Sequence, residues 1–284
     1  ELNGWSEGKG SITTVINHGS ANSSGNGSTD GGYTRVGNLG TIETYMSGGT
    51  SGSGSQLEFE NSDTGKVGWL DGNSEDGASI IVTNEGEVAD VIGVGADGKG
   101  SSATVSNNGT AGSMDATGSN GGEVKADNSG VIENGVGVNA NGEGSKAELI
   151  NSGEANRIYG DANEGGTTSV TNDGKVTGDG SAITMTDPNS GESWEETSGK
   201  LNGWAGGEGS SMTVVNNGTV GDVVGVNADG KGSSVTVSNN GTAGSMDAIG
   251  WNGGEVKANN SGVIENGVGV NANGEGSKAE LINS

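Results

Sequence analysis

An asparagine that is followed two residues later by glycine returns along the chain at intervals of mostly 21 or 23 residues. The first two of these corners are Asn17-His18-Gly19 and Asn38-Leu39-Gly40, and the last complete one is Asn260-Ser261-Gly262. A short fixed period is the sequence signature of a solenoid, in which each repeat forms one coil and stacks on the next. The repeat therefore predicts an elongated, stacked fold for the whole chain.

The residues before each corner alternate in polarity. Aliphatic side chains stand four and two positions before the corner asparagine, as Ile80 and Val82 do before Asn84, and the positions between them are polar. Strict alternation indicates a half-buried strand and puts the asparagine on the inward side. There it can bond to the next corner and to the turn backbone. This predicts a structural ladder of Asn17, Asn38, Asn61, Asn84, Asn107, Asn128, Asn151, Asn172, Asn216, Asn239, Asn260 and Asn283.

A second strand is expected after each corner. The corner glycine is expected to supply a positive φ angle, and an aliphatic residue follows two positions later, as at Val88 and Ile132. Each coil then ends in a turn rich in Asp, Asn and Gly. The sequence predicts an all-β parallel β-helix, or β-solenoid, with two or three strands per coil, about 22 residues per coil and roughly 13 coils. At ~4.8 Å per coil this would be a rod of roughly 60 Å.

The sequence also contains a longer repeat that spans several coils. Residues 84–152 return at 216–284 with few changes, an offset of 132 residues that corresponds to six coils of 22. The chain starts and stops in mid-repeat without an obvious cap, so residues 1–284 are expected to be one elongated solenoid, a fragment or stackable subunit of a larger repeat protein. An irregular coil with a loop is expected at 178–204, and looser insertions are expected at 21–32 and 47–55.

Composition leaves one alternative fold and excludes several partners. Only 28% of the residues are hydrophobic, which would suit a disordered linker, but a linker has no reason to place valines in register. A net charge of −25 disfavours nucleic acid and anionic membranes. No stretch of about 20 apolar residues could span a bilayer. Expected partners are further copies of the chain, or surface glycans and proteins.

Catalysis finds little support in the residues. The single histidine, His18, lies in a corner, and the abundant carboxylates are typical of a solvated acidic surface. The sequence therefore predicts no enzyme. No cofactor is required. Calcium binding is left open as a hypothesis, because the second turns and the expected loop at 71–76 supply oxygen ligands. The candidate calcium ligands are Asp71, Asp76, Asp97 and Asp229, and plain Asx turns are the alternative explanation.

Five tryptophans are candidate contacts for a partner. An exposed indole can stack on a sugar or on another solenoid, or it can cover a corner of the coil. These residues are Trp5, Trp69, Trp194, Trp204 and Trp251. Flat solenoids that order water at ice carry rows of outward threonines, but pairs such as Thr13-Thr14 do not continue into an array here.

Strings such as Val235-Thr236-Val237-Ser238-Asn239-Asn240-Gly241-Thr242 resemble bacterial β-solenoid cell-surface repeat proteins, in particular the passenger domains of autotransporter adhesins. The resemblance covers nearly the whole chain and lies in architecture and composition. It implies a non-enzymatic, extracellular structural or adhesive rod at the cell surface, used for surface attachment or self-association. Three alternatives stay open: a head-to-tail filament or surface-layer subunit, a β-helix that binds or degrades polysaccharide, and an ice-binding solenoid.

Overall fold

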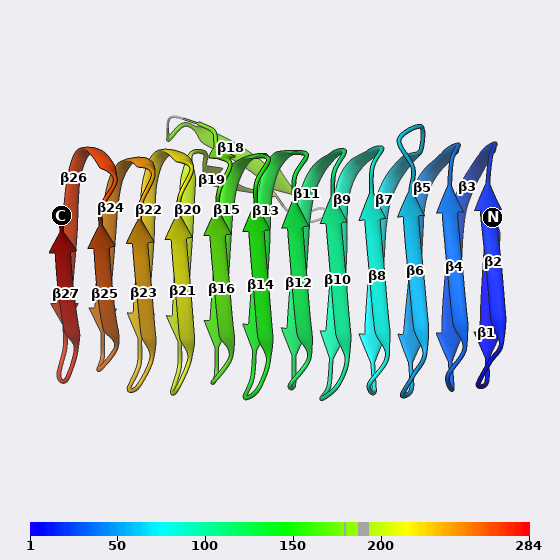
Figure 1. The fold of residues 1–284 in the computed structure, drawn as a ribbon, viewed down its shortest axis with the longest axis horizontal. Helices are drawn as coiled ribbons and strands as arrows, with labels where there is room; N and C mark the ends of the chain where they lie inside the picture. The colour runs from blue at the N-terminus through cyan, green and yellow to red at the C-terminus, as the bar shows by residue number, and fades with distance from the viewer. Residues whose placement is uncertain (179, 187–192) are drawn as a thin grey trace. The chain divides into compact units, whose positions relative to one another are not determined.

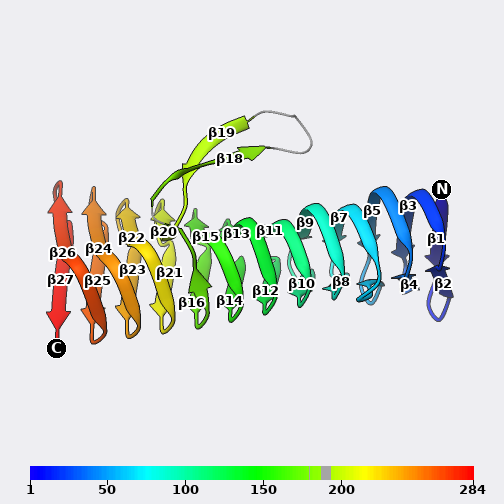
Figure 2. The same ribbon diagram turned by 90° about the horizontal axis from the view of Figure 1, so that it is seen from above.

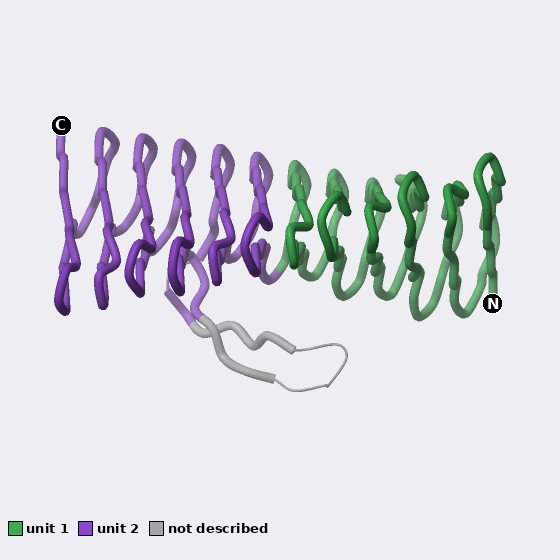
Figure 3. The backbone as a smooth tube through the Cα atoms, turned by 90° about the horizontal axis from the view of Figure 1, so that it is seen from below, with its two compact units in different colours: residues 1–133 green, residues 134–284 purple. Residues whose placement is uncertain are grey.

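The computed structural model describes residues 1–178, 180–186 and 193–284, and the chain divides into two compact units, Glu1–Glu133 and Asn134–Ser284 (Figure 3). Each unit is a β-solenoid in which a coil gives one strand to each of two parallel sheets, apart from one coil of unit 2 that carries an insertion (Figure 1). This confirms the predicted fold class, with about 22 residues per coil. Within the described residues, no helix has the length and apolarity needed to cross a bilayer.

Unit 1 contains a sheet of six-residue strands, called here the short-strand sheet, and a second sheet whose strands are mostly longer, the long-strand sheet. The short strands are β2 (Ile12–Asn17), β4 (Tyr33–Asn38), β6 (Gln56–Asn61), β8 (Ser79–Asn84), β10 (Ser102–Asn107) and β12 (Glu123–Asn128). The long-strand sheet holds β1 (Leu2–Glu7), β3 (Ser20–Thr29), β5 (Thr41–Ser51), β7 (Lys66–Glu75), β9 (Glu87–Asp97) and β11 (Thr110–Ser119). The long strands shift register near their start, as between Ala111 and Ser113, which marks a β-bulge.

Unit 2 repeats this arrangement. Its short strands are β14 (Lys146–Asn151), β16 (Thr167–Asn172), β21 (Ser211–Asn216), β23 (Ser234–Asn239), β25 (Glu255–Asn260) and β27 (Lys278–Asn283). Its long-strand sheet holds β15 (Glu154–Asn163), β17 (Lys175–Val176), β20 (Lys200–Gly206), β22 (Thr219–Asp229), β24 (Thr242–Trp251) and β26 (Val263–Asn273), and β13 (Val131–Asn141) crosses the boundary between the two ranges. The described residues thus form twelve short strands, one for each coil, close to the predicted thirteen.

One coil of unit 2 carries an insertion. The short β17 and the following β20 together occupy one position in the long-strand sheet, because both pair with β15 on one side and β22 on the other. Between them, β18 (Ala182–Thr186) pairs antiparallel with β19 (Ser193–Thr197) in a hairpin that projects from the coils (Figure 2). The chain is back in the sheet at Lys200, earlier than the end of the expected irregular coil at 204.

The insertion changes the count of coils in the duplicated block. Strand β16 pairs directly with β21, so Asn172 is in register with Asn216, 44 residues later. The offset of 132 residues therefore covers five coils and an insertion, and the predicted six coils of 22 were wrong. Asn189-Ser190-Gly191, which also matches the corner pattern, and the single proline, Pro188, lie outside the described residues.

The looser insertions expected at 21–32 and 47–55 were also wrong, because β3 and β5 pair continuously from Ser23 to Thr29, after a bulge near the start that other long strands share. The inward positions of β3 are polar and buried: Ser24, Asn26 and Ser28. Asn26 Nδ2 donates to Ser24 Oγ at 2.8 Å, and the Ser28 hydroxyl bonds to that of Thr50 at 2.7 Å. Asn26 Oδ1 is buried without a partner among the described residues. Because these inward residues are polar, the sequence of β3 shows no alternation of hydrophobic and polar residues from which a strand could be predicted.

The corner glycines have a different role from the one expected. Their φ angles lie outside the left-handed region, and the positive angles occur instead in the second turn, as at Gly98 and Gly100. A Cβ atom on Gly109 would lie 2.1 Å from the carbonyl oxygen of Gly86 in the preceding corner, and one on Gly130 would lie 2.0 Å from that of Gly109. Successive corners stack so closely that no side chain fits between them.

Candidate functional site

The corner asparagines form a hydrogen-bonded ladder in each unit. Every Nδ2 donates to Oδ1 of the next corner asparagine at 2.7–2.8 Å, from Asn17 to Asn128 in unit 1 and from Asn151 to Asn283 in unit 2. The same Nδ2 also reaches the carbonyl oxygen of its own corner glycine, at 3.3 Å in Asn84. Most of these side chains are fully buried. The ladder satisfies the inward polar groups of each coil through its neighbours.

The four candidate calcium ligands are not brought together. Asp71 lies within strand β7, which replaces the expected loop at 71–76, whereas Asp76 follows that strand with a φ of 53°. Asp97 Oδ1 accepts from Asn120 Nδ2 at 2.7 Å, and Asp229 Oδ1 accepts from Asn252 Nδ2 at 2.9 Å. In the part of the chain that the structure describes, no group of three or more His, Cys, Asp or Glu side chains could hold a metal ion.

Two carboxyl groups on the outer face of the long-strand sheets have shifted acidity. Burial raises the pKa of Asp71 above its ordinary value. Burial also raises the pKa of Asp161, and the nearby Arg157 guanidinium opposes that shift. The same guanidinium lies 5.3 Å from the ring centroid of Tyr159, within reach of a cation–π contact. These three residues were not among the candidates from the sequence, although their spacing at every second position of β15 places them on one face of the strand.

The tryptophans divide into different environments. Trp69 is half-buried with its ring centroid 5.9 Å from that of Tyr45, whereas Trp5, Trp204 and Trp251 are 58%, 50% and 43% exposed. All four lie in the long-strand sheets. The side chain of Trp194 lies outside the described residues, although its backbone belongs to β19. The exposed indoles are therefore available to partners in both units.

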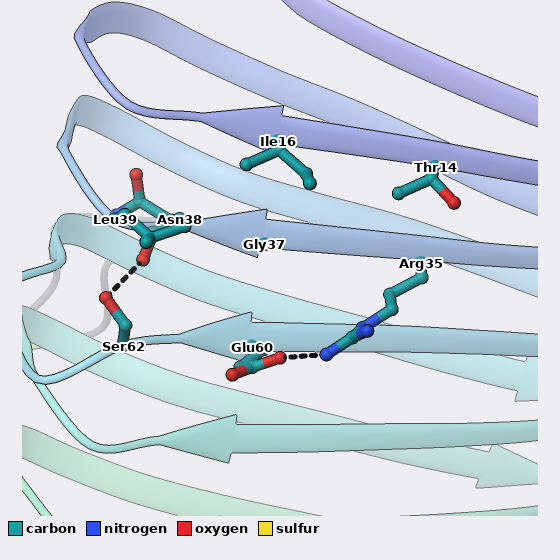
Figure 4. Close-up of a pocket in the computed structure, with 8 residues that line it drawn as sticks. All are labelled: Thr14, Ile16, Arg35, Gly37, Asn38, Leu39, Glu60 and Ser62. Carbon is teal, nitrogen blue, oxygen red and sulfur yellow. Dashed lines mark hydrogen bonds and ion pairs between the residues drawn. The ribbon is translucent and has the colours of Figure 1, made fainter.

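A shallow hollow of about 180 Å³ lies on the outer face of the short-strand sheet in unit 1 (Figure 4). Its centre is Gly37, where an added Cβ would meet nothing within 4 Å, and Ile16 and Leu39 give it an apolar edge. The Arg35 guanidinium on its rim is 2.5 Å from Glu60 and 3.6 Å from Glu58. Since this cation is already paired, the hollow is a poor site for an anion.

Two further hollows lie beside exposed tryptophans. In unit 2, a hollow of about 490 Å³ is lined by Trp204 together with Asn141, Asn163, Glu164 and Asp229. A Cβ on Gly206, in its floor, would lie 3.0 Å from both the Trp204 indole nitrogen and Asn163 Oδ1. From the sequence, Trp204 and Asp229 were both candidate site residues, but their place in one hollow with Asn141, Asn163 and Glu164 depends on the stacking of different coils.

The hollow in unit 1 has about 330 Å³ and a similar lining. Trp5 forms one side, and Thr29, Ser51, Asn73 and Glu75 supply hydroxyl, amide and carboxylate groups. The indole lies across Gly27 of the next coil, because a Cβ there would be 2.1 Å from Trp5 Cζ3. These two are called the tryptophan hollows below.

Comparisons with protein-family models, curated proteins and solved structures found no match. Function is therefore inferred from the residues and geometry of the chain.

Proposed function

We propose that this chain is a non-enzymatic, extracellular structural segment that attaches a cell surface to other surfaces or to further copies of itself. The observation that carries the proposal is the asparagine ladder. Each coil satisfies its inward polar groups through its two neighbours, as expected of a repeat protein stabilised by nearest-neighbour contacts. The outer positions of every strand are then free to vary, and they can contact partners without loss of the fold.

The outer rows support attachment over an ice-binding role. Along one row of the short-strand sheet in unit 1 the residues are Thr14, Arg35, Glu58, Ile81 and Thr104. This mixture of charged and apolar side chains differs from the repeated threonine array that an ice-binding face requires. The resemblance of the repeats to the passenger domains of autotransporter adhesins supports the extracellular location.

A retention assay tests the proposal. Microspheres that carry the chain should be held on surfaces coated with neutral glycans or with the chain itself, several-fold more than microspheres that carry an unrelated protein of similar net charge. Equal retention on every surface, with no increase of the sedimentation coefficient at high concentration, would refute attachment and self-association together. Release of new reducing ends from a polysaccharide would refute the non-enzymatic part, and end-to-end fibres in electron micrographs would favour the filament alternative.

A further inference from the structure

We propose that the two tryptophan hollows are binding sites for a neutral oligosaccharide. One sugar ring stacks on the indole of Trp204 or Trp5, and its hydroxyls bond to the polar side chains around it. This inference rests on the attachment role proposed above and supplies the chemical class of its ligand.

Both hollows are built on the same tetrapeptide. The tetrapeptide Leu-Asn-Gly-Trp occurs at residues 2–5, at the start of β1, and again at residues 201–204 in β20. The glycine faces inward in each: a Cβ on Gly4 would lie 2.5 Å from Val15 Cγ2, and one on Gly203 would lie 2.7 Å from Met212 Cε. Because no inward side chain fits at this glycine, the two sheets approach closely, and alternation directs the tryptophan outward. The same local design therefore presents an indole beside a polar hollow in each unit.

The groups around each indole match the chemistry of a sugar. The apolar face of an aromatic ring packs well against a flat C–H surface, while its neighbours can bond to hydroxyls. Around Trp204 these neighbours are the amides of Asn141 and Asn163 and the carboxylates of Glu164 and Asp229. A carboxylate offers about four acceptor sites. Asp229 can therefore accept from Asn252 at 2.9 Å and still bond to sugar hydroxyls.

Charge restricts the ligand to a neutral one. Among the described residues, no Lys, Arg or His side chain lines either tryptophan hollow, whereas Glu75, Glu164 and Asp229 do. An anionic sugar or a nucleic acid would meet carboxylates without a compensating cation. A second copy of this chain would bring its own share of the −25 charge, which also disfavours close contact at these carboxylates.

The size of the hollows indicates more than one sugar ring. In unit 2, Asn163, Gly206 and Asp229 follow one another in register on successive coils, and Asn163 Nδ2 donates to Asn141 Oδ1 at 3.1 Å on the other side. Three steps of ~4.8 Å between coils give a length of about 14 Å. An oligosaccharide can lie along this length with one ring on the indole.

The test is a fluorescence titration of the intact chain with short neutral gluco-, manno- and galacto-oligosaccharides, and with oligogalacturonate as the anionic probe. At least one neutral series should shift tryptophan emission with saturation at two sites per chain, and oligogalacturonate should not. Trp204→Ala should weaken binding at one site about tenfold, the equivalent of about 1.4 kcal/mol, and Trp5→Ala should do the same at the other. Trp251→Ala is the matched control, since this indole is also exposed but lines neither hollow.

A second variant separates the site from the fold. Gly206→Ala places a methyl group in the floor of the unit 2 hollow and keeps Trp204, so it should also weaken binding, with an unchanged circular dichroism spectrum. Absence of binding by every neutral series, equal binding of oligogalacturonate, or tryptophan variants that behave like Trp251→Ala would each overturn the proposal. If the microspheres still attach while no oligosaccharide binds, this site is lost and the attachment role stands.

Discussion

Removal of one amide from the middle of the ladder measures how much the ladder stabilises a coil. In unit 1, Asn84 Nδ2 donates to Asn107 Oδ1 at 2.7 Å and to the Thr110 carbonyl oxygen at 3.2 Å. Its own Oδ1 accepts from Asn61 Nδ2 at 2.8 Å, and the side chain is 0% exposed. In Asn84→Ala, therefore, buried groups on both neighbouring coils lose a hydrogen-bond partner.

The magnitude follows from these contacts. A buried polar group that loses its partner costs about 1–3 kcal/mol. Asn61 Nδ2 keeps contacts with the carbonyl oxygens of Gly65 at 3.2 Å and Glu87 at 3.3 Å, so its loss belongs at the low end of that range. Asn107 Oδ1 loses its donor as well. The losses at these two atoms together give an expected decrease in the free energy of unfolding of about 2–4 kcal/mol. This is a large share of the ~5–15 kcal/mol typical of a folded domain.

Urea denaturation followed by circular dichroism measures this decrease from the shift of the midpoint at constant slope. The matched control is Asn108→Ala, which removes an exposed corner amide whose Oδ1 accepts from Ser129 Oγ at 2.7 Å. Its expected effect is within about 0.5 kcal/mol. If Asn84→Ala destabilised the chain no more than Asn108→Ala, the reasoning from the ladder would be refuted.

Gly109→Ala should lower the free energy of unfolding by at least about 1–3 kcal/mol, because its methyl group would lie 2.1 Å from the preceding corner carbonyl oxygen. Gly37→Ala, which meets nothing within 4 Å, should leave it nearly unchanged, and equal urea midpoints would contradict this reading of the corners. Burial raises the pKa of Asp71, so the folded chain holds this proton more tightly than the unfolded chain and loses stability as the pH rises through that raised pKa. Calorimetry of Asp71→Asn should show a higher Tm than the parent at neutral pH and no difference below the ordinary pKa of 3.8, whereas the same gain at both pH values would argue against a charge effect. Lys66→Ala removes an exposed pair with Glu87 at 2.6 Å and should cost less than about 1 kcal/mol, a loss that added salt should reduce further.

The features of the fold that recur in every coil could be predicted from the sequence. The period of the corners and the alternation before them reflect contacts between neighbouring coils, and such contacts are repeated along the chain. The ladder of buried asparagines follows from the same two patterns. For Ser24, Asn26 and Ser28 the pattern failed, since their inward side chains are polar and buried and carry no hydrophobic signal.

The remaining features depend on distances between coils, which one strand does not encode. The need for glycine at the corners comes from the carbonyl oxygen of the preceding corner, not from the backbone angle of the glycine itself. The tryptophan hollows combine residues that are far apart in the sequence, such as Asn141 and Asp229, whose separation includes the inserted hairpin. Repetition of Leu-Asn-Gly-Trp was the sequence signal for these hollows, but it identified only the tryptophans.

The split strand of β17 and β20 has a consequence for engineering. The chain leaves the sheet after Val176 and returns at Lys200. Just before this return, the Gly199 N–H donates to the Asn156 carbonyl oxygen at 2.7 Å, and the Gly199 carbonyl oxygen accepts from the Asp222 N–H at 2.9 Å. Several other long strands have a bulge at the corresponding place, as at Ala111 and Ser113 or at Val220 and Val223. Foreign peptides grafted at several bulges would then be displayed on one side of a unit, at spacings set by the number of coils between them.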